Sequence, residues 1–292
     1  MTKPFLSPRN DAVFKMLFGD ARDTSLLIGF LKSTLTLPAE DYTDVTIIDP
    51  HSPRDVPDDK QGILDVKIKT ASGKRINVEI QIVNHADLRE RILFYLARMV
   101  TEQIGEGEDY QNIRRSICIL ITDHVQISEN RVYHNRYRLR DAETGSEFTD
   151  LVEINTLELP KLPCETDGTV LWNWLKFLDV RRKEELTMLT QDPQIGKAVA
   201  KLMALSEDEE ARMLAESREK LRRDISAAEH AARKEGLERG REEGREEGRG
   251  KAQLAIARKA LEKGLAVETV AAITGLSQSD ILLLQSEEGI GH

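Results

Sequence analysis

Two neighbouring segments, residues 63–69 and 76–83, alternate between apolar and polar side chains. The apolar positions are Leu64, Val66 and Ile68 in the first segment and Ile76, Val78, Ile80 and Ile82 in the second. Alternation with a period of two, rich in valine and isoleucine, is typical of β-strands that bury one face. Ser72 and Gly73 between the segments favour a tight turn. The pattern therefore predicts an antiparallel β-hairpin.

The polar face of this predicted hairpin carries two carboxylates, an amide and a lysine, from Asp65, Glu79, Gln81 and Lys67. Registers that place Asp65 opposite Glu79, or opposite Gln81, keep all apolar side chains on one face. Like charges directly opposite each other destabilise a sheet. A hard divalent cation would neutralise both acids, because such cations take oxygen ligands. A solvated strand face on which the acids merely alternate stays an equally open alternative.

Helical periodicity and strand patterns occupy most of the first 190 residues. Helices are predicted for residues 11–35, with a break at Gly19-Asp20, and for residues 87–104 and 170–189. Further strands are predicted for residues 42–49, 115–122, 133–140 and 147–159. Strands and helices that follow one another in this order are expected to form an α/β fold.

The chain becomes densely charged after Ser206, and a glycine-periodic repeat follows. The segment KEGLERGREEGREEGRG has glycine at every fourth position, at residues 236, 240, 244 and 248. A helix would gather these glycines in a ridge without side chains, which could pack on a partner backbone. Each glycine costs such a helix roughly 0.8–1 kcal/mol relative to alanine. A flexible charged linker is the competing interpretation.

Apolar periodicity returns in the last forty residues or so, where the spacing of a helix-turn-helix is matched by Ala271, Gly275, Ile281 and Leu284. The second helix, SQSDILLLQS, offers Gln278 to a DNA groove but no arginine or lysine. Its Asp280 would repel phosphate. We therefore favour a small helical hairpin for assembly over a DNA-reading unit, and we expect a homo-oligomer formed through the C-terminal region.

Composition narrows the class of protein. The 292 residues include 42 lysines and arginines and 51 acids, for a formal net charge of −9. Local basic patches, and not this net charge, decide contacts with phosphates. Only Cys118 and Cys164 occur, which argues against a disulfide framework and a cysteine-based zinc site. An apolar leader and an apolar run of membrane-spanning length are both lacking, so we expect a cytoplasmic protein without a membrane partner.

Several motifs occur in a characteristic order: NDAVFKMLFGD, GILDV, NVEIQ, GEDYQNIRRSICILI, TLELPK and the Glu-Gly-Arg repeat. This series, over roughly residues 4–250, resembles the recombination-promoting nuclease/transposase (Rpn) family of the PD-(D/E)XK nuclease superfamily. The resemblance implies a restriction-endonuclease-like mixed sheet flanked by helices, with an all-helical charged C-terminal extension. The expected parts are a nuclease-like core at 1–165, a helical extension at 166–205, a charged glycine-periodic helix or linker at 206–250, and a helix-turn-helix-like hairpin at 251–292.

The resemblance also implies roles for individual residues. Asp65 of GILDV and Glu79 of NVEIQ would be the metal ligands, with Mg²⁺ or alternatively Mn²⁺ as cofactor. Gln81 stands where the superfamily usually has lysine, so it can orient a water but brings no charge. Lys67 is a candidate to supply that charge, although an ordinary surface lysine is the simpler interpretation. Asp11 is the candidate for the superfamily's early helical acid.

Six arginines are candidates for contacts with DNA phosphates, namely Arg89, Arg91, Arg98, Arg136, Arg138 and Arg140. Any one of them could merely cover a sheet surface, and we expect the contact from the set. The leading hypothesis is a metal-dependent DNA endonuclease linked to recombination or transposition. One alternative is a catalytically weak DNA-binding or assembly protein that retains the nuclease fold. Another is a helical scaffold that depends on the C-terminal region alone.

Overall fold

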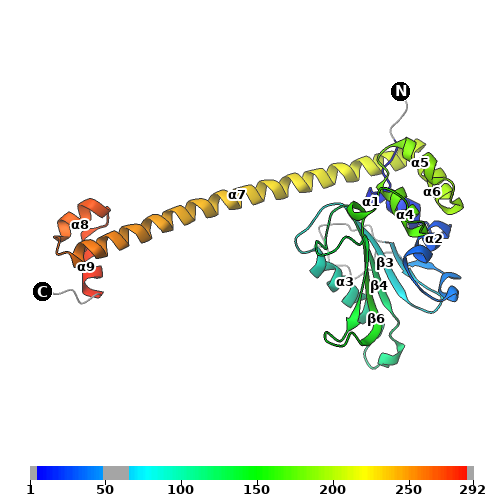
Figure 1. Cartoon of the computed structure of the whole chain (residues 1–292), viewed down its shortest axis with the longest axis horizontal. Helices are drawn as coiled ribbons and strands as arrows, with labels where there is room; N and C mark the ends of the chain where they lie inside the picture. Colours follow the sequence, from blue (N-terminus) through cyan, green and yellow to red (C-terminus); the bar gives the residue numbers. More distant parts are fainter. Residues whose placement is uncertain (1–4, 49–65, 288–292) are drawn as a thin grey trace. The chain divides into compact units, whose positions relative to one another are not determined.

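The computed structural model describes residues 5–48 and 66–287. The chain folds as two units, residues 1–222 and residues 223–292. The boundary between them falls inside helix α7 (Glu209–Glu262). Figure 1 labels the helices α1 to α9 and the strands β3, β4 and β6.

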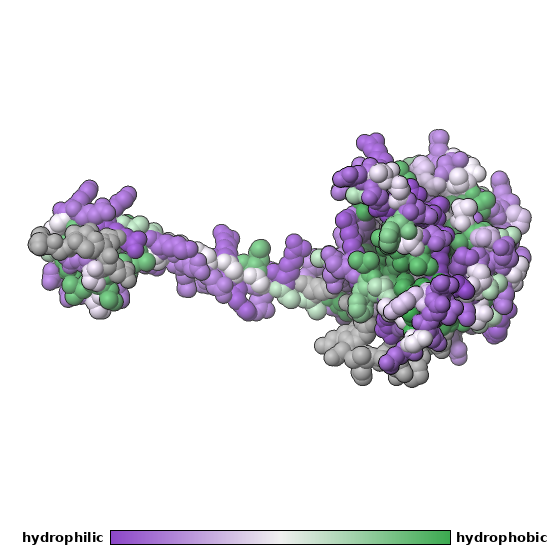
Figure 2. Space-filling view, turned by 90° about the horizontal axis from the view of Figure 1, so that it is seen from below, coloured by the Kyte–Doolittle hydropathy of each residue, from purple (hydrophilic) through white to green (hydrophobic). Residues whose placement is uncertain are grey.

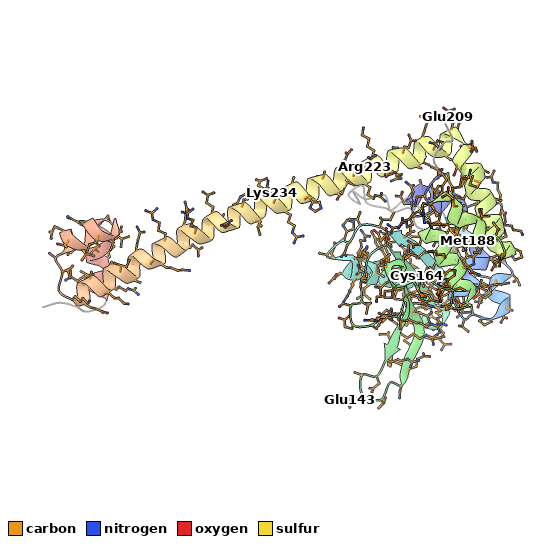
Figure 3. The ribbon with its side chains drawn as sticks, turned by 45° about the horizontal axis from the view of Figure 1, so that its top comes forward. Glu143, Cys164, Met188, Glu209, Arg223 and Lys234 are labelled. Carbon is orange, nitrogen blue, oxygen red and sulfur yellow. The ribbon has the colours of Figure 1, made fainter. Side chains whose placement is uncertain are left out.

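A six-stranded mixed sheet forms the centre of the first unit, in the order β1-β2-β3-β4-β6-β5. β3 pairs with β4 and β4 with β6 in parallel, and the other neighbours are antiparallel. The strands are β1 (Thr46–Ile48), β2 (Val66–Lys69), β3 (Arg75–Gln81), β4 (Ser116–Thr122), β5 (His134–Arg140) and β6 (Glu147–Glu158). The predicted mixed sheet is therefore confirmed. Glu143, labelled in Figure 3, lies in the turn that joins β5 to β6.

The predicted hairpin is present as β2 and β3. Lys67 lies opposite Asn77 and Val66 opposite Val78. Gly73 in the connecting turn has φ +87°, a backbone conformation that glycine adopts without strain. Asp65, the residue before Val66, lies outside the described residues.

Helices cover both faces of the sheet (Figure 1). On one face α1 (Asp11–Phe18), α2 (Ser25–Thr34), α4 (Val170–Asp179) and α6 (Pro193–Glu207) enclose the main core. The largest fully buried side chains there belong to Trp174, Phe14, Phe18, Phe30 and Phe177. On the other face α3 (Leu88–Thr101) packs Leu88, Ile92 and Leu96 against Cys118 and Leu120 of β4. The two faces of β3 therefore meet different layers.

Several predicted boundaries need correction. The segment expected as one helix over 170–189 is two helices, α4 and α5 (Lys183–Leu189), separated by a break that begins at the buried Val180. The strand expected over 42–49 begins only at Thr46, because a 3₁₀ turn, η1 (Ala39–Tyr42), takes up Tyr42. Helix α6 lies almost wholly within the expected helical extension at 166–205, although its own bounds were not predicted. Two further 3₁₀ turns are η2 (Tyr110–Asn112) and η3 (Leu159–Lys161). The predicted break at Gly19-Asp20 is confirmed by the end of α1.

Helix α7 is continuous over 54 residues and includes the whole glycine repeat. Its first turns belong to the first unit, where Ala211 and Ala215 are buried and Asn10 Nδ2 donates to Ala215 O at 3.0 Å. Beyond Arg223 its surface is hydrophilic along most of its length, as Figure 2 shows. The exposed side chains of Arg223 and Lys234 lie there (Figure 3). The structure thus has the repeat as helix and not as a flexible linker.

The second unit is a small three-helix cluster. The end of α7 packs with α8 (Val267–Thr274) and α9 (Gln278–Glu287), and the buried residues are Ala257, Leu261, Val270, Ile281 and Leu284. The predicted two-helix hairpin therefore gains a third helix from α7. Within the ranges 5–48 and 66–287, no single helix is long and apolar enough to cross a membrane; α8 and the first nine residues of α9 pass that test only as a pair bent by 118°.

Candidate active site

Glu79 is a buried carboxylate in the middle of the sheet. Its residue is 1% exposed, and its side chain points to the face that α3 covers. Arg91 Nη2 of α3 donates to Glu79 Oε1 at 3.1 Å, and Gln81 Nε2 of the same strand donates to the same oxygen. Glu79 Oε2 is buried and has no hydrogen-bond partner in the described part of the chain. The carboxylate is therefore only half satisfied.

The surroundings of Glu79 act on its pKa in opposite directions. Burial raises the pKa, because it disfavours the charged form. The charge of Arg91, the hydrogen bonds from Gln81 and Arg91, and the charge of Lys67 lower it, but they do not cancel the effect of burial. A buried oxygen without a partner is costly. Oε2 thus favours either a proton or a cation beside it.

Three of the four residues of the predicted polar face, Lys67, Glu79 and Gln81, are described, and they share one face of the hairpin. Gln81 contacts Glu79 directly, and Lys67 stands on the same face of β2, opposite Asn77. Asp65 lies outside the described residues, so its pairing with Glu79 or Gln81 stays a prediction. Asp11 lies in the first turn of α1, on the opposite face of the sheet, where its Oδ1 accepts from Ala12 N at 2.8 Å. Among the described residues, Asp11 makes no hydrogen bond with Glu79, so its role as the early helical acid stays a prediction.

The arginines of α3 have separate partners. Arg91 forms the ion pair with Glu79. Arg89 Nη2 donates to the backbone oxygen of Gln126, and Arg98 Nε donates to Glu102 Oε1 at 2.6 Å. Arg91 therefore orients the buried carboxylate, a role that its position in the sequence did not reveal.

The arginines of β5 lie on the face of the sheet away from Glu79. Tyr137, between them, pairs with Ile154, which packs against the α3 cluster, so Arg136 and Arg138 point to the other side. Arg138 Nε lies 2.6 Å from the buried Glu153 Oε2, and Arg136 Nε lies 4.0 Å from Glu153 Oε1. Arg138 and Arg140 also pair with Glu147, at 3.0 and 3.8 Å. These cations form an ion-pair network at a distance from the candidate site.

A second buried carboxylate, that of Glu158, lies at the C-terminal end of β6. Glu158 is 0% exposed and forms an ion pair with Lys161 at 3.1 Å, and it accepts from Gln126 N at 2.9 Å. It pairs with Thr122, which in turn pairs with Gln81. The TLELPK motif contains both Glu158 and Lys161, but its alternation alone did not indicate that the glutamate is buried. Its partners indicate that it anchors the segment after β4.

The described residues contain no group of three or more histidine, cysteine, aspartate or glutamate side chains that could hold a metal ion. Glu79 is nevertheless suited to contribute one ligand, because its Oε2 is buried and unpartnered within those residues. Divalent cations such as Mg²⁺ need only one or two carboxylates when waters and phosphate oxygens complete the shell. Asp65 is the sequence-predicted source of the second carboxylate.

Comparison with known protein families gives two matches. The model of the PD-(D/E)XK nuclease family transposases matches residues 8–232. The model of the C-terminal helix-turn-helix domain of the Rpn/YhgA-like nuclease family matches residues 251–286. No curated protein and no solved structure gives a significant match. The first match covers most of the chain and agrees with the restriction-endonuclease-like mixed sheet flanked by helices.

Proposed function

Because the chain belongs to the PD-(D/E)XK nuclease family transposases, within the Rpn family, we propose that it is a metal-dependent DNA endonuclease that hydrolyses phosphodiester bonds. The observation that carries this proposal is the half-satisfied carboxylate of Glu79. Buried polar atoms are nearly always hydrogen-bonded, whereas Glu79 keeps Oε2 buried and without a hydrogen bond from the described residues.

Glu79 and Asp65 would hold the cation, with Mg²⁺ as the proposed ion and Mn²⁺ as the alternative. Such an ion, when bound, polarises a phosphate oxygen and lowers the pKa of a bound water. Asp65 directly precedes Val66, which pairs with Val78, the neighbour of Glu79. This adjacency supports Asp65 as the second ligand.

The neighbours of Glu79 have defined tasks in this proposal. Arg91 holds Glu79 through Oε1, which would leave Oε2 to hold an ion. Gln81 donates its amide hydrogen to the same Oε1, which leaves its amide oxygen to accept a hydrogen bond from the attacking water. Lys67 supplies a positive charge on the same face. Arg89 and Arg98 would contact the bound DNA near the site, and the β5 arginines would contact it outside the site.

A supercoiled plasmid assay tests the proposal, with Mg²⁺, Mn²⁺ or EDTA in parallel reactions. We expect nicked and linear products with either ion and none with EDTA. The Asp65→Ala protein should bind DNA and fail to cut it. A well-folded Asp65→Ala protein with normal activity would contradict the assignment of this ligand.

The structure also gives some support to the alternative, a catalytically weak DNA-binding protein. Arg91 already compensates the charge of Glu79, and Gln81 brings no positive charge to the place of the usual lysine. This protein would shift plasmid DNA in a gel equally well with EDTA and with Mg²⁺, and would leave it supercoiled. The same reactions therefore separate the two functions.

A further inference from the structure

A small pocket lies between the β2–β3 hairpin and the C-terminal half of α3, and its lining residue Asn77 stands two residues before Glu79 on β3. Its volume is about 70 Å³. The side chains that matter for its chemistry are those of Lys67, Arg75 and Asn77 from the hairpin and Tyr95, Arg98 and Glu102 from α3 and the residue that follows it. The space holds a few water molecules, which is about the size of a phosphate group and too little for a nucleobase.

The pocket carries more positive than negative charge. Arg98 Nε donates to Glu102 Oε1 at 2.6 Å, and Arg75 Nη2 donates to the backbone oxygen of Glu102 at 3.3 Å. Glu102 is the single carboxylate among the described residues that line the pocket, and it offsets one of three cations. The two arginines present planar donor groups, which suit the oxygens of a phosphate.

Lys67 connects this pocket to the candidate active site. Its Nζ makes no hydrogen bond or ion pair with any residue that the structure describes, although the side chain is half-buried. Its partner Asn77 and Glu79 stand on the same face of β3, two residues apart, which is about 6.6 Å at a strand rise of ~3.3 Å per residue. Lys67 is close enough for its charge to act on Glu79. A phosphate held by Lys67 would therefore lie close to Glu79, on the same face of the sheet.

We propose that this pocket binds a phosphate group of a nucleic-acid strand, with Lys67 and Arg75 as its principal ligands. That the phosphate belongs to a nucleic-acid strand rests on the proposed function. That the pocket binds a phosphate at all rests on its charge, size and position. Two sources supply the same chemistry: the phosphodiester next to the one that is cut, or a phosphate at the end of a strand.

The test measures binding by the full chain in EDTA, so that no cleavage is needed. Fluorescence anisotropy would follow single-stranded oligonucleotides of one sequence with hydroxyl ends, a 5′-phosphate or a 3′-phosphate, over a range of salt concentrations. The variants are Lys67→Gln and Arg75→Gln. Lys69→Gln is the matched control, because Lys69 is an exposed lysine on the same strand and the same face and does not line the pocket.

We expect Lys67→Gln and Arg75→Gln each to weaken binding about tenfold, which is ~1.4 kcal/mol. Each should also reduce the slope of log K against log salt by about 0.7, the value for one contact with a single-strand phosphate. Lys69→Gln should change affinity less than twofold. Lys67→Arg keeps the positive charge and should restore the wild-type salt slope. If the lysine were merely structural, the salt slope would not depend on its charge.

The oligonucleotides separate the two sources. An equal loss with every oligonucleotide identifies the internal phosphodiester, and a loss confined to one phosphorylated end identifies a terminal phosphate. Lys67→Gln and Lys69→Gln proteins that bind alike, with equal salt slopes, would overturn the proposal. Since binding is measured without a metal, the two proposals can fail separately. If the wild-type protein does not cut plasmid but the two pocket variants bind more weakly, only the proposed endonuclease is contradicted. If the wild-type protein cuts plasmid but the pocket variants bind normally, only the phosphate pocket is contradicted.

Discussion

At the scale of single residues, the arrangement around Glu79 determines what the site can do. One oxygen accepts from Arg91 and Gln81, and the other is buried with no hydrogen bond from a described residue. Replacing Glu79 by glutamine keeps its size and its capacity to accept from Arg91, and it removes the charge that would bind a cation.

We predict that Glu79→Gln lowers plasmid cleavage more than 100-fold and changes DNA affinity less than twofold. Losing a metal ligand should cost more than the ~10–100-fold that follows loss of an outer partner of a ligand. Glu90→Gln is the matched control, because Glu90 is an exposed glutamate on α3. A Glu79→Gln protein that melts at the wild-type temperature and cuts at the wild-type rate would remove Glu79 from the site.

Gln81→Lys tests the residue that departs from the superfamily. The new ammonium would stand within reach of Glu79 and would stay charged, because an opposite charge nearby favours the charged form. With Arg91 it would place a second cation on one carboxylate and would compete with the metal. We expect a higher Mg²⁺ requirement and no gain in rate. Cleavage rates over an Mg²⁺ titration decide this, and a faster reaction at saturating Mg²⁺ would show that Gln81 is a degraded lysine.

The alternation of side chains was enough to predict that Lys67, Glu79 and Gln81 share one face of a hairpin, and the structure has them there. The partnership between Glu79 and Arg91 was beyond that reasoning, because it depends on how α3 lies across the sheet. The β5 arginines illustrate the same limit. Their alternation predicted a common face, but the order of six strands decides which face of the sheet that is.

At the scale of elements, a buried aspartate ties the β2–β3 turn to η1. Asp41 is 0% exposed and accepts from Thr70 Oγ1 at 2.9 Å, from Lys74 Nζ at 2.7 Å and from Ser72. Burial by itself would raise the pKa of Asp41, but the hydrogen bonds from Lys74, Ser72 and Thr70 outweigh it and lower the pKa below its ordinary value. The charged form is therefore the one that stabilises the turn.

We predict that Asp41→Asn lowers the free energy of unfolding by about 1–3 kcal/mol at pH 7. A carboxyl with a lowered folded-state pKa stabilises the fold above its unfolded pKa of ~3.9, and this contribution is lost as the pH falls through the folded value. The difference between wild type and variant should thus be full at pH 7 and shrink below about pH 4. Urea unfolding across pH measures it, with the exposed Asp44→Asn as control. A difference that grows on acidification would contradict this role.

The glycine repeat of α7 allows a prediction of opposite sign. A Cβ added at Gly240 or Gly244 would meet nothing within 4 Å. Alanine at either position should therefore stabilise the helix by ~0.8–1 kcal/mol. Hydrogen exchange of the amides around the repeat should slow in Gly240→Ala and quicken in Ala228→Gly, which exchanges an exposed alanine of the same helix for glycine. Faster exchange in Gly240→Ala would mean that the ridge packs against another backbone.

Helix α6 shows why the bounds of some elements escaped prediction. It begins at Pro193 with Asp192 as N-cap, a start signal that the sequence does contain. Its buried residues Ile195, Ala198 and Leu202 are few, and the charged segment that follows obscured their periodicity. The break between α4 and α5 depends on the burial of Val180 in the main core, which a local pattern does not reveal.

At the scale of the whole chain, the boundary between the two units lies later than the charged segment suggested. Ser206, Ala211 and Ala215 are buried in the first unit, and Leu6 N donates to Ser206 Oγ at 2.9 Å. A chain cut after residue 205 would lose these contacts. A chain cut after Arg222 would keep the complete first unit.

The last prediction concerns assembly through the C-terminal region. The three-helix cluster leaves Ile273, Leu282 and Leu283 exposed on α8 and α9. The exposed Asp280 lies in the first turn of α9, the helix that a DNA-reading unit would place in the groove. Exposed apolar side chains favour contact with protein, whereas an aspartate disfavours contact with phosphate.

We therefore expect light scattering to show an oligomer for the full chain and a monomer for residues 1–222, with the latter melting as a single unit. The Leu283→Gln full chain should dissociate at higher concentration than wild type, while the exposed Leu237→Gln, on α7 outside the cluster, should not. An equal number of protomers in the full chain and in residues 1–222 would assign assembly to the first unit and leave the helix-turn-helix domain free for DNA.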